Sequence, residues 1–211
     1  MPAGLCADTP DPEGGILAKA SLFREFLMHR ICQCADAAVL LDEAGRMIPA
    51  QMLTRAVAET TIMLFWLHQK SVEFTVTKNE AQFERFLLKG TYGSSRATAL
   101  DQACTVLMTV DRFDKEAQGF KQLFDVMCER TDTNYTAAMN THRWVDTKGG
   151  ARHRQEHLPD PPGHSAEDLL MACLKLAQEY NGRISALLAV SEAGVVHPRE
   201  PEAQHKSRNK F

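Results

Sequence analysis

One stretch constrains the fold of this chain more than any other. Residues 51–69 contain neither glycine nor proline and are apolar on more than one side. The apolar residues are Met52, Leu53, Val57, Ile62, Met63, Leu64, Phe65, Trp66 and Leu67. Pro49 suits the first turn of a helix, where its missing N–H leaves no hydrogen bond unmade. Because a helix this apolar must be covered on several sides, the stretch predicts the central helix of a bundle.

Further helices are expected around this central one. Apolar residues at helical spacing predict helices over about 16–41, 79–88, 96–113, 120–129, 135–145 and 165–190. Residues 71–77 are polar and β-branched, which favours a short connection with a brief extended segment. The predicted fold class is therefore all-α, a single-domain helical bundle of five to seven helices.

Capping residues predict several helix boundaries. Gly45 favours the end of the first helix, Asn79 the start of another helix and Gly90 its end. Ser165, followed three residues later by Asp168, approximates a capping box at the start of the last helix.

The helical domain is expected to occupy residues 15–191. Residues 1–14 are rich in proline and glycine and contain no apolar run, so we expect a disordered leader there. Residues 192–211 are polar and end in a basic run, which predicts a disordered tail. Residues 148–164 hold several glycines and prolines and form the most irregular internal segment.

Composition narrows the class of protein. Hydrophobic residues make up 44% of the 211 residues, as in globular proteins, and the net charge of -3 gives no overall reason to expect a nucleic-acid or membrane partner. Six scattered cysteines without zinc-site spacing favour buried thiols in a reducing compartment and predict no cofactor or metal. The apolar run at 62–67 is too short to span a bilayer, so we expect a cytoplasmic protein with no membrane partner.

The central helix carries two charged residues, Arg55 and Glu59, which share one face because they lie four residues apart. One interpretation is a structural ion pair, since a charge on a largely buried helix needs a partner. The other is that Arg55 faces a cleft and holds an anion such as a phosphate or a carboxylate.

A second polar group lies around Asp132 and Asn134, which are typical of turns and helix caps. His142 follows Tyr135 by seven residues, so the two would lie on one face of the helix predicted there. The histidine is interpreted either as a hydrogen-bonded structural group or as a catalyst.

A third group, Arg152 to His157, resembles the R-x4-6-H pattern of the HEPN ribonucleases (higher-eukaryote and prokaryote nucleotide-binding). That resemblance implies metal-independent chemistry, in which the histidine transfers a proton and the arginine stabilises charge at the scissile phosphate. A solvated basic loop is the alternative interpretation.

The two motifs on the central helix and around residue 132 resemble a bacterial family of unknown function, the DUF5677-type proteins. Leu53, Arg55 and Glu59 fit its L-x-R-x-x-x-E helix, and residues 124–135 are similar to its second motif. The resemblance covers residues 20–190 in general layout and implies a HEPN-like helical bundle. It transfers to Arg55, Glu59, Glu129 and Asn134. Asp132 stands where the family pattern has a histidine, and His142 could replace that histidine.

Two hypotheses follow. The first is a HEPN-like domain of a bacterial defence or toxin system that binds or cleaves RNA. Its catalytic candidates are Arg55, Glu59, Asp132 and His142, and its candidates for binding nucleic acid are Arg143, Arg152, Arg154 and His157. The second is a non-catalytic helical interaction module, acting as a homo-dimer or a subunit of a complex. Convergence of the catalytic candidates on an open cleft favours the first hypothesis.

Overall fold

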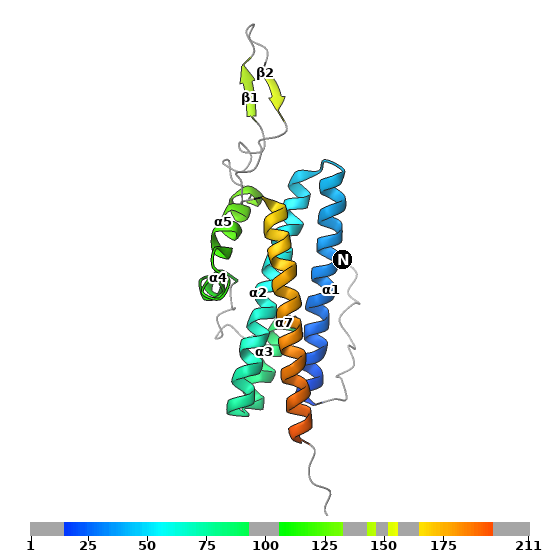
Figure 1. Ribbon diagram of the computed structural model, residues 1–211, viewed down its shortest axis with the longest axis vertical. Helices are drawn as coiled ribbons and strands as arrows, with labels where there is room; N and C mark the ends of the chain where they lie inside the picture. Colours follow the sequence, from blue (N-terminus) through cyan, green and yellow to red (C-terminus); the bar gives the residue numbers. More distant parts are fainter. Residues whose placement is uncertain (1–14, 93–105, 133–142, 147–151, 156–164, 196–211) are drawn as a thin grey trace, which may run out of the picture.

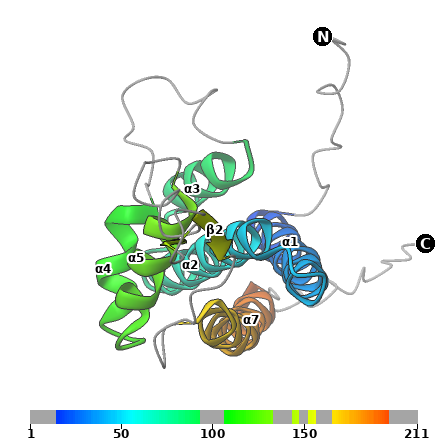
Figure 2. The same cartoon turned by 90° about the horizontal axis from the view of Figure 1, so that it is seen from above.

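The computed structural model describes residues 15–92, 106–132, 143–146, 152–155 and 165–195. Its elements, in chain order, are α1 (Ile16–Glu43), α2 (Met47–Thr77), α3 (Glu80–Tyr92), α4 (Val106–Asp114), α5 (Phe120–Thr131), β1 (Arg143–Asp146), β2 (Arg152–Gln155) and α7 (Ala166–Val195). The long helices α1, α2 and α7 run alongside one another, and α4 and α5 lie on one side of α2 (Figures 1 and 2). The all-α bundle expected from the sequence is confirmed, with a small β hairpin added to it.

Helix α2 is the centre of the bundle, as its apolar sequence predicts. It packs against α1, α3, α4, α5 and α7, which are all the other helices of the described part. Ile62, Leu64, Phe65 and Leu67 are fully buried although they point in different directions around the helix. Neighbours on several sides are what a helix with this pattern requires.

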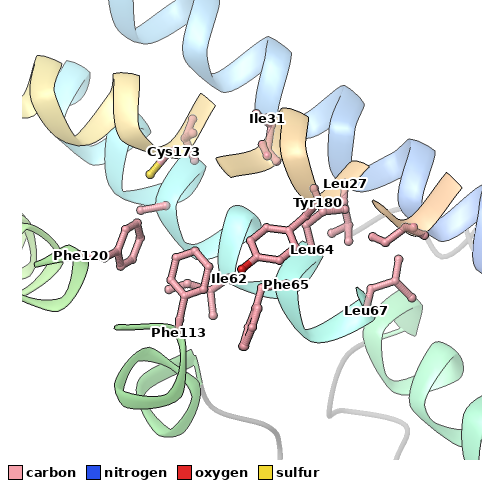
Figure 3. Packing of buried hydrophobic residues seen from close by; sticks show 14 of the residues in the cluster. Leu27, Ile31, Ile62, Leu64, Phe65, Leu67, Phe113, Phe120, Cys173 and Tyr180 are labelled. Carbon is pink, nitrogen blue, oxygen red and sulfur yellow. The ribbon is translucent and has the colours of Figure 1, made fainter. Parts of the chain in front are cut away.

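The core joins three helices through aromatic rings. Phe65 of α2 lies with its ring centroid 5.0 Å from that of Phe113 on α4 and 5.5 Å from that of Tyr180 on α7. Figure 3 shows these rings meeting beside Ile62 and Leu64. Aromatic pairs at such separations add to the stabilisation that comes from burial alone.

Three predicted boundaries are confirmed. Gly45 has a φ of 71°, in the left-handed region that glycine adopts most easily, and follows the end of α1. The Gln82 N–H donates to Asn79 Oδ1 at 3.1 Å, which caps α3. The Asp168 N–H donates to Ser165 Oγ at 3.0 Å and the Ser165 N–H donates to Asp168 Oδ2 at 3.2 Å, completing the capping box of α7.

The predicted connection at residues 71–77 is wrong, because these residues form the last two turns of α2. Phe74 is 8% exposed and stacks on Phe83 of α3, with ring centroids 4.9 Å apart. The hydroxyls of Ser71 and Thr77 donate to the backbone carbonyls of Leu67 and Glu73, four residues earlier. Burial of the Phe74 side chain and the local hydrogen bonds of the two hydroxyls therefore outweigh the β propensity of the segment.

The prediction of helix up to residue 145 is also wrong. Residues 143–146 form β1 and pair antiparallel with β2 at residues 152–155, inside the segment expected to be irregular. The register places Trp144 opposite Arg154 and Asp146 opposite Arg152. Figure 1 shows the hairpin beyond the end of the bundle at which α5 ends and α7 begins.

Several expectations concern residues outside the described ranges. These are the leader at 1–14, the parts of predicted helices at 96–105 and 135–142, and the tail from 196 onward. Helix α7 continues to Val195, past the end expected near residue 190.

Gly90 does not end α3 but lies within it, against α1. A Cβ atom built there would overlap the ring of Phe23 at Cζ, and Phe23 is 4% exposed. Gly90→Ala is therefore expected to destabilise the fold by about 1–3 kcal/mol through overpacking, although the same change usually stabilises a helix. Urea unfolding followed by circular dichroism measures the change.

Gly182 on α7 provides the matched control, because no atom lies within 4 Å of the Cβ built there. Gly182→Ala is expected to stabilise the protein by about 0.5–1 kcal/mol. Equal gains in both variants would contradict the close packing of Gly90 on Phe23.

Candidate functional site

Arg55 is the centre of a polar cluster that joins α2 to the end of α5. Its Nε donates to Glu59 Oε1 at 3.0 Å, and its Nη1 donates to Asp132 Oδ1 at 2.9 Å and to Thr131 Oγ1 at 3.1 Å. We call Arg55, Glu59, Thr131 and Asp132 the Arg55 cluster. The structure thus brings together three of the four residues chosen as catalytic candidates, and the fourth, His142, lies outside the described residues.

The packing of α5 against the bundle positions Thr131 and Asp132 beside Arg55. Phe124 and Met127 are buried, and Thr131 follows them at helical spacing, so it faces the bundle. Asp132 is the C-cap of α5 and has an extended backbone, with its N–H bonded to the carbonyl of Cys128. The end of the helix therefore places one hydroxyl and one carboxylate beside Arg55.

The Arg55 cluster lies at the surface and is not sealed in the core. The side chains of Arg55, Glu59 and Asp132 are 30%, 37% and 51% exposed. Burial lowers the pKa of Arg55, but hydrogen bonds to Asp132 and Glu59 outweigh that effect and raise it above its ordinary value. The guanidinium is thus a permanent charge that solvent can reach.

Charge within the cluster limits what it can bind. One cation faces two carboxylates, and both of them repel a phosphate that approaches Arg55. Asp132 is the more exposed of the two carboxylates and lies at the end of α5. Glu59 lies on α2, one turn from Arg55 on that helix. Arg55 can therefore bind an anion when Asp132 moves aside, with Glu59 left beside it as a carboxylate base.

Cys128 near this cluster is not poised as a nucleophile. Burial raises the pKa of its thiol, and the nearby Asp132 and Glu59 raise it further, although Arg55 acts in the opposite direction. A thiol with a raised pKa carries little of the reactive thiolate at neutral pH.

The nucleic-acid candidates lie on the hairpin. Arg143 is the first residue of β1, and Arg152 and Arg154 both lie on β2. In the register, Arg143 pairs with Gln155, Arg154 with Trp144 and Arg152 with Asp146. The last candidate, His157, lies outside the described residues.

The family resemblance also pointed to Glu129 and Asn134. Glu129 is exposed on α5 and lines a shallow groove of about 580 Å³ with Asp114, Lys121 and Asp125, apart from the Arg55 cluster. Asn134 lies outside the described residues. Sequence reasoning missed Thr131, whose one signal is its position directly before Asp132 at a helix end.

A second polar cluster lies between α2, the α4–α5 turn and α7. The Tyr180 hydroxyl donates to Glu116 Oε2 at 2.8 Å, and Gln69 Nε2 donates to Glu116 Oε1 at 3.0 Å. The His68 ring centroid lies 5.5 Å from that of Tyr180, and His68 Nδ1 is buried without a partner among the described residues. Burial lowers the pKa of His68, Arg183 lowers it further and Glu116 raises it.

This lowered pKa predicts a loss of stability in acid. As the pH falls below 6.5, the ordinary pKa, the unfolded chain binds a proton at His68 before the folded chain does. Stability is therefore full above that pH and decreases as the pH falls toward the lower pKa of the folded state. His68→Phe keeps a ring against Tyr180 and is expected to flatten this part of the profile. The measurement is the free energy of unfolding from about pH 8 to about pH 5; profiles of the same slope for variant and wild type would contradict the assignment.

Two further properties belong to the described residues alone. No group of three or more histidine, cysteine, aspartate or glutamate side chains in those ranges could hold a metal ion. Within the same ranges, no helix combines the length and the apolar character that a bilayer-spanning segment needs.

Comparison with known proteins places the chain in a family. A family model described as "Family of unknown function (DUF5677)" matches residues 25–135, which include α2, α5 and the whole Arg55 cluster. No curated protein and no solved structure matches the chain.

Proposed function

Because the chain belongs to DUF5677, a family of unknown function, we infer its function from its own side chains and propose that it binds RNA and cleaves it without a metal ion. The observation that carries this proposal is the presence of Arg143, Arg152 and Arg154 on two paired strands beyond the end of the bundle (Figure 1). The Arg55 cluster supplies the proposed site of cleavage.

The hairpin is rich in positively charged residues, which the phosphate backbone of RNA attracts. Its eight strand residues include these three arginines and one acidic residue, Asp146, in a chain whose net charge is -3. Arginine binds phosphate with several N–H groups at once, and such contacts supply most of the sequence-independent affinity for nucleic acid. A local basic element on an otherwise acidic chain is therefore the surface on which RNA would bind.

The Arg55 cluster supports the chemical half of the proposal. In the proposed reaction, Glu59 accepts the proton of the ribose 2′-hydroxyl, whose oxygen then attacks the adjacent phosphorus. The 5′-oxygen leaves with a proton from His142, and the product is a 2′,3′-cyclic phosphate. Arg55 stabilises the charge on the phosphate oxygens once Asp132 has moved aside. The HEPN-like resemblance implies proton transfer by the histidine and charge stabilisation by the arginine, and Glu59 as the base is part of the proposal.

The biological setting of this proposal is a defence or toxin system in the bacterial cytoplasm. The HEPN-like resemblance is what supports that setting. Toxicity on expression that Arg55→Ala or His142→Ala relieves would support it, and high-yield expression without co-purified RNA would count against it.

The alternative is a non-catalytic helical module that binds another protein or a second copy of itself. Two observations favour it. Both carboxylates already satisfy Arg55, which a purely structural ion pair also requires. Apolar side chains such as Phe26 and Leu40 on α1 are 51% and 66% exposed.

The test is binding to a labelled single-stranded RNA of about 20 nucleotides, measured by fluorescence anisotropy in EDTA at several salt concentrations. We expect the triple variant Arg143→Gln, Arg152→Gln and Arg154→Gln to bind more weakly. Because each phosphate contact on a single strand contributes about 0.7 to the slope of log K against log salt, three lost contacts should reduce that slope by about 2.

A control with the same change in charge separates this effect from general electrostatics. Lys78, Lys115 and Lys175 are exposed on the bundle, and their replacement by glutamine removes three positive charges far along the chain from the hairpin. An equal loss in both triple variants would assign binding to net charge alone, and no binding by the wild type would favour the interaction module.

A further inference from the structure

The partly exposed residues of α2 form a stripe that leads away from the Arg55 cluster. Arg55, Glu59, Met63, Trp66 and Lys70 are all partly exposed and follow one another at intervals of three or four residues. Arg55 and Trp66 are eleven residues apart, which corresponds to about 16 Å along a helix. The residues between the stripe positions are mostly buried. The stripe is therefore the open edge of the central helix.

Trp66 lies on this stripe and has two cations over its ring. Lys70 Nζ is 5.6 Å and the Arg112 guanidinium carbon is 5.9 Å from the centroid of the indole ring. Both distances are near the outer limit of about 6 Å for a cation–π contact. Both cations therefore lie over the ring but are held there only weakly, so a stacking base can displace either of them from its face.

The two cations differ in their other partners. Lys70 is paired with Glu73 at 2.6 Å on the same helix. Arg112 is exposed on α4 and makes no ion pair within the described residues, although Glu73 lies near enough to interact with it through space. Arg112 thus offers an accessible guanidinium beside an aromatic ring.

We propose that Trp66 and Arg112 form a base-stacking subsite for single-stranded RNA. A base stacks on the Trp66 indole, and Arg112 contacts the phosphate next to it. The inference rests on the proposed function and extends it, because it predicts that RNA runs along α2 from the Arg55 cluster to Trp66.

Physical chemistry favours RNA over other ligands at this position. Proteins that bind single strands combine cationic side chains with aromatic rings on which bases stack, and every base has a face that can stack. Trp66 and Lys70 lie on α2 and Arg112 lies on α4, so the ring and the cations meet at the boundary between these helices. An extended RNA strand can bind along such a boundary, because it needs no closed pocket. A purely structural cation–π contact is the competing explanation, and it predicts no response to RNA.

The experiment uses the tryptophan itself as the reporter. The chain has two tryptophans, so Trp144→Phe leaves Trp66 as the only one. Oligouridine titrated into this variant should quench the Trp66 fluorescence until the site is saturated. An abasic ribose-phosphate chain of the same length carries the phosphates without bases and should leave the fluorescence almost unchanged.

Binding of the variants then separates the roles of ring and cation. Trp66→Leu is expected to weaken oligouridine binding about ten-fold and to leave binding of the abasic chain unchanged. Arg112→Gln should weaken binding of both chains, whereas Lys115→Gln, in the turn directly after α4, should weaken neither. Trp66→Phe keeps an aromatic face and the fold, so it should retain most of the affinity.

Each failure has a distinct pattern. Unquenched Trp66 and an unchanged affinity of Trp66→Leu, with binding still dependent on the hairpin arginines, would overturn the subsite and leave the proposed function standing. Absence of RNA binding by the wild type would overturn both. Weaker binding by Trp66→Leu and Trp66→Phe alike, for both chains, would assign Trp66 to structure and overturn the subsite.

Discussion

Replacing Phe65 by alanine is expected to cost about 3–5 kcal/mol of stability, the largest effect of any single substitution considered. Phe65 is completely buried, and its ring contacts Phe113 of α4 and Tyr180 of α7. The truncation opens a cavity at the place where three helices meet, and these helices cannot all close it at once. Denaturant unfolding followed by circular dichroism gives the free energy of unfolding.

Two companion variants give this prediction its control. Phe65→Leu keeps most of the volume and should cost less than Phe65→Ala. Phe26 on α1 is 51% exposed, and Phe26→Ala removes an equal ring with an expected change within about 0.5 kcal/mol. A loss in Phe65→Ala no larger than that in Phe26→Ala would contradict the central position of α2.

Arg55→Ala is expected to reduce metal-independent cleavage of RNA by about 10²–10³-fold, the range found when one donor to a charged transition state is lost. The same variant leaves Glu59 and Asp132 without their shared cation. Asp132→Asn should raise the affinity for RNA, because it removes a negative charge that repels phosphate from Arg55. Initial rates in EDTA and binding by anisotropy measure the two effects.

Arg183 on α7 is the matched control for Arg55. It is also an arginine in a surface pair with a glutamate four residues away, Glu179. Arg183→Ala should leave cleavage unchanged. If Arg55→Ala and Asp132→Asn change stability but neither cleavage nor binding, the Arg55 cluster is a structural ion pair and the interaction module is the better account.

The bundle was predictable because its signals are local. The central position of α2 follows from an apolar pattern that no single neighbour could cover, and the structure confirms it. Asn79 and Ser165 cap their helices as predicted because a cap depends on a few adjacent residues. A capping side chain accepts a hydrogen bond from a backbone N–H a few residues away, so distant residues have little influence on where such a helix begins.

The predictions of secondary structure were wrong where contacts between residues distant in sequence determine the local conformation. Residues 71–77 look extended by propensity, yet the contact of Phe74 with Phe83 on α3 keeps them helical. The hairpin depends on pairing between residues 143–146 and 152–155, and neither strand is recognisable without the other. Gly90 resembles a helix end in sequence, and only the position of Phe23 on α1 explains why it lies within a helix.

The Arg55 cluster was partly predictable. The spacing of Arg55 and Glu59 on one helix predicts that they can pair, and they do. Asp132 is 77 residues from Arg55 and no local pattern connects them; it is a candidate because it stands where the family pattern has a histidine. The part played by Thr131 follows from how α5 packs on α2, which the sequence does not specify.

The central claim is that RNA is the ligand, and photochemical crosslinking tests it most directly. Purified full-length protein is irradiated with a 4-thiouridine-containing single-stranded RNA in EDTA, and mass spectrometry identifies the modified peptides. We predict adducts on peptides that contain β1 or β2, with fewer adducts as salt rises. Adducts no more frequent than on an unrelated acidic protein, or spread without preference along the chain, would contradict the claim.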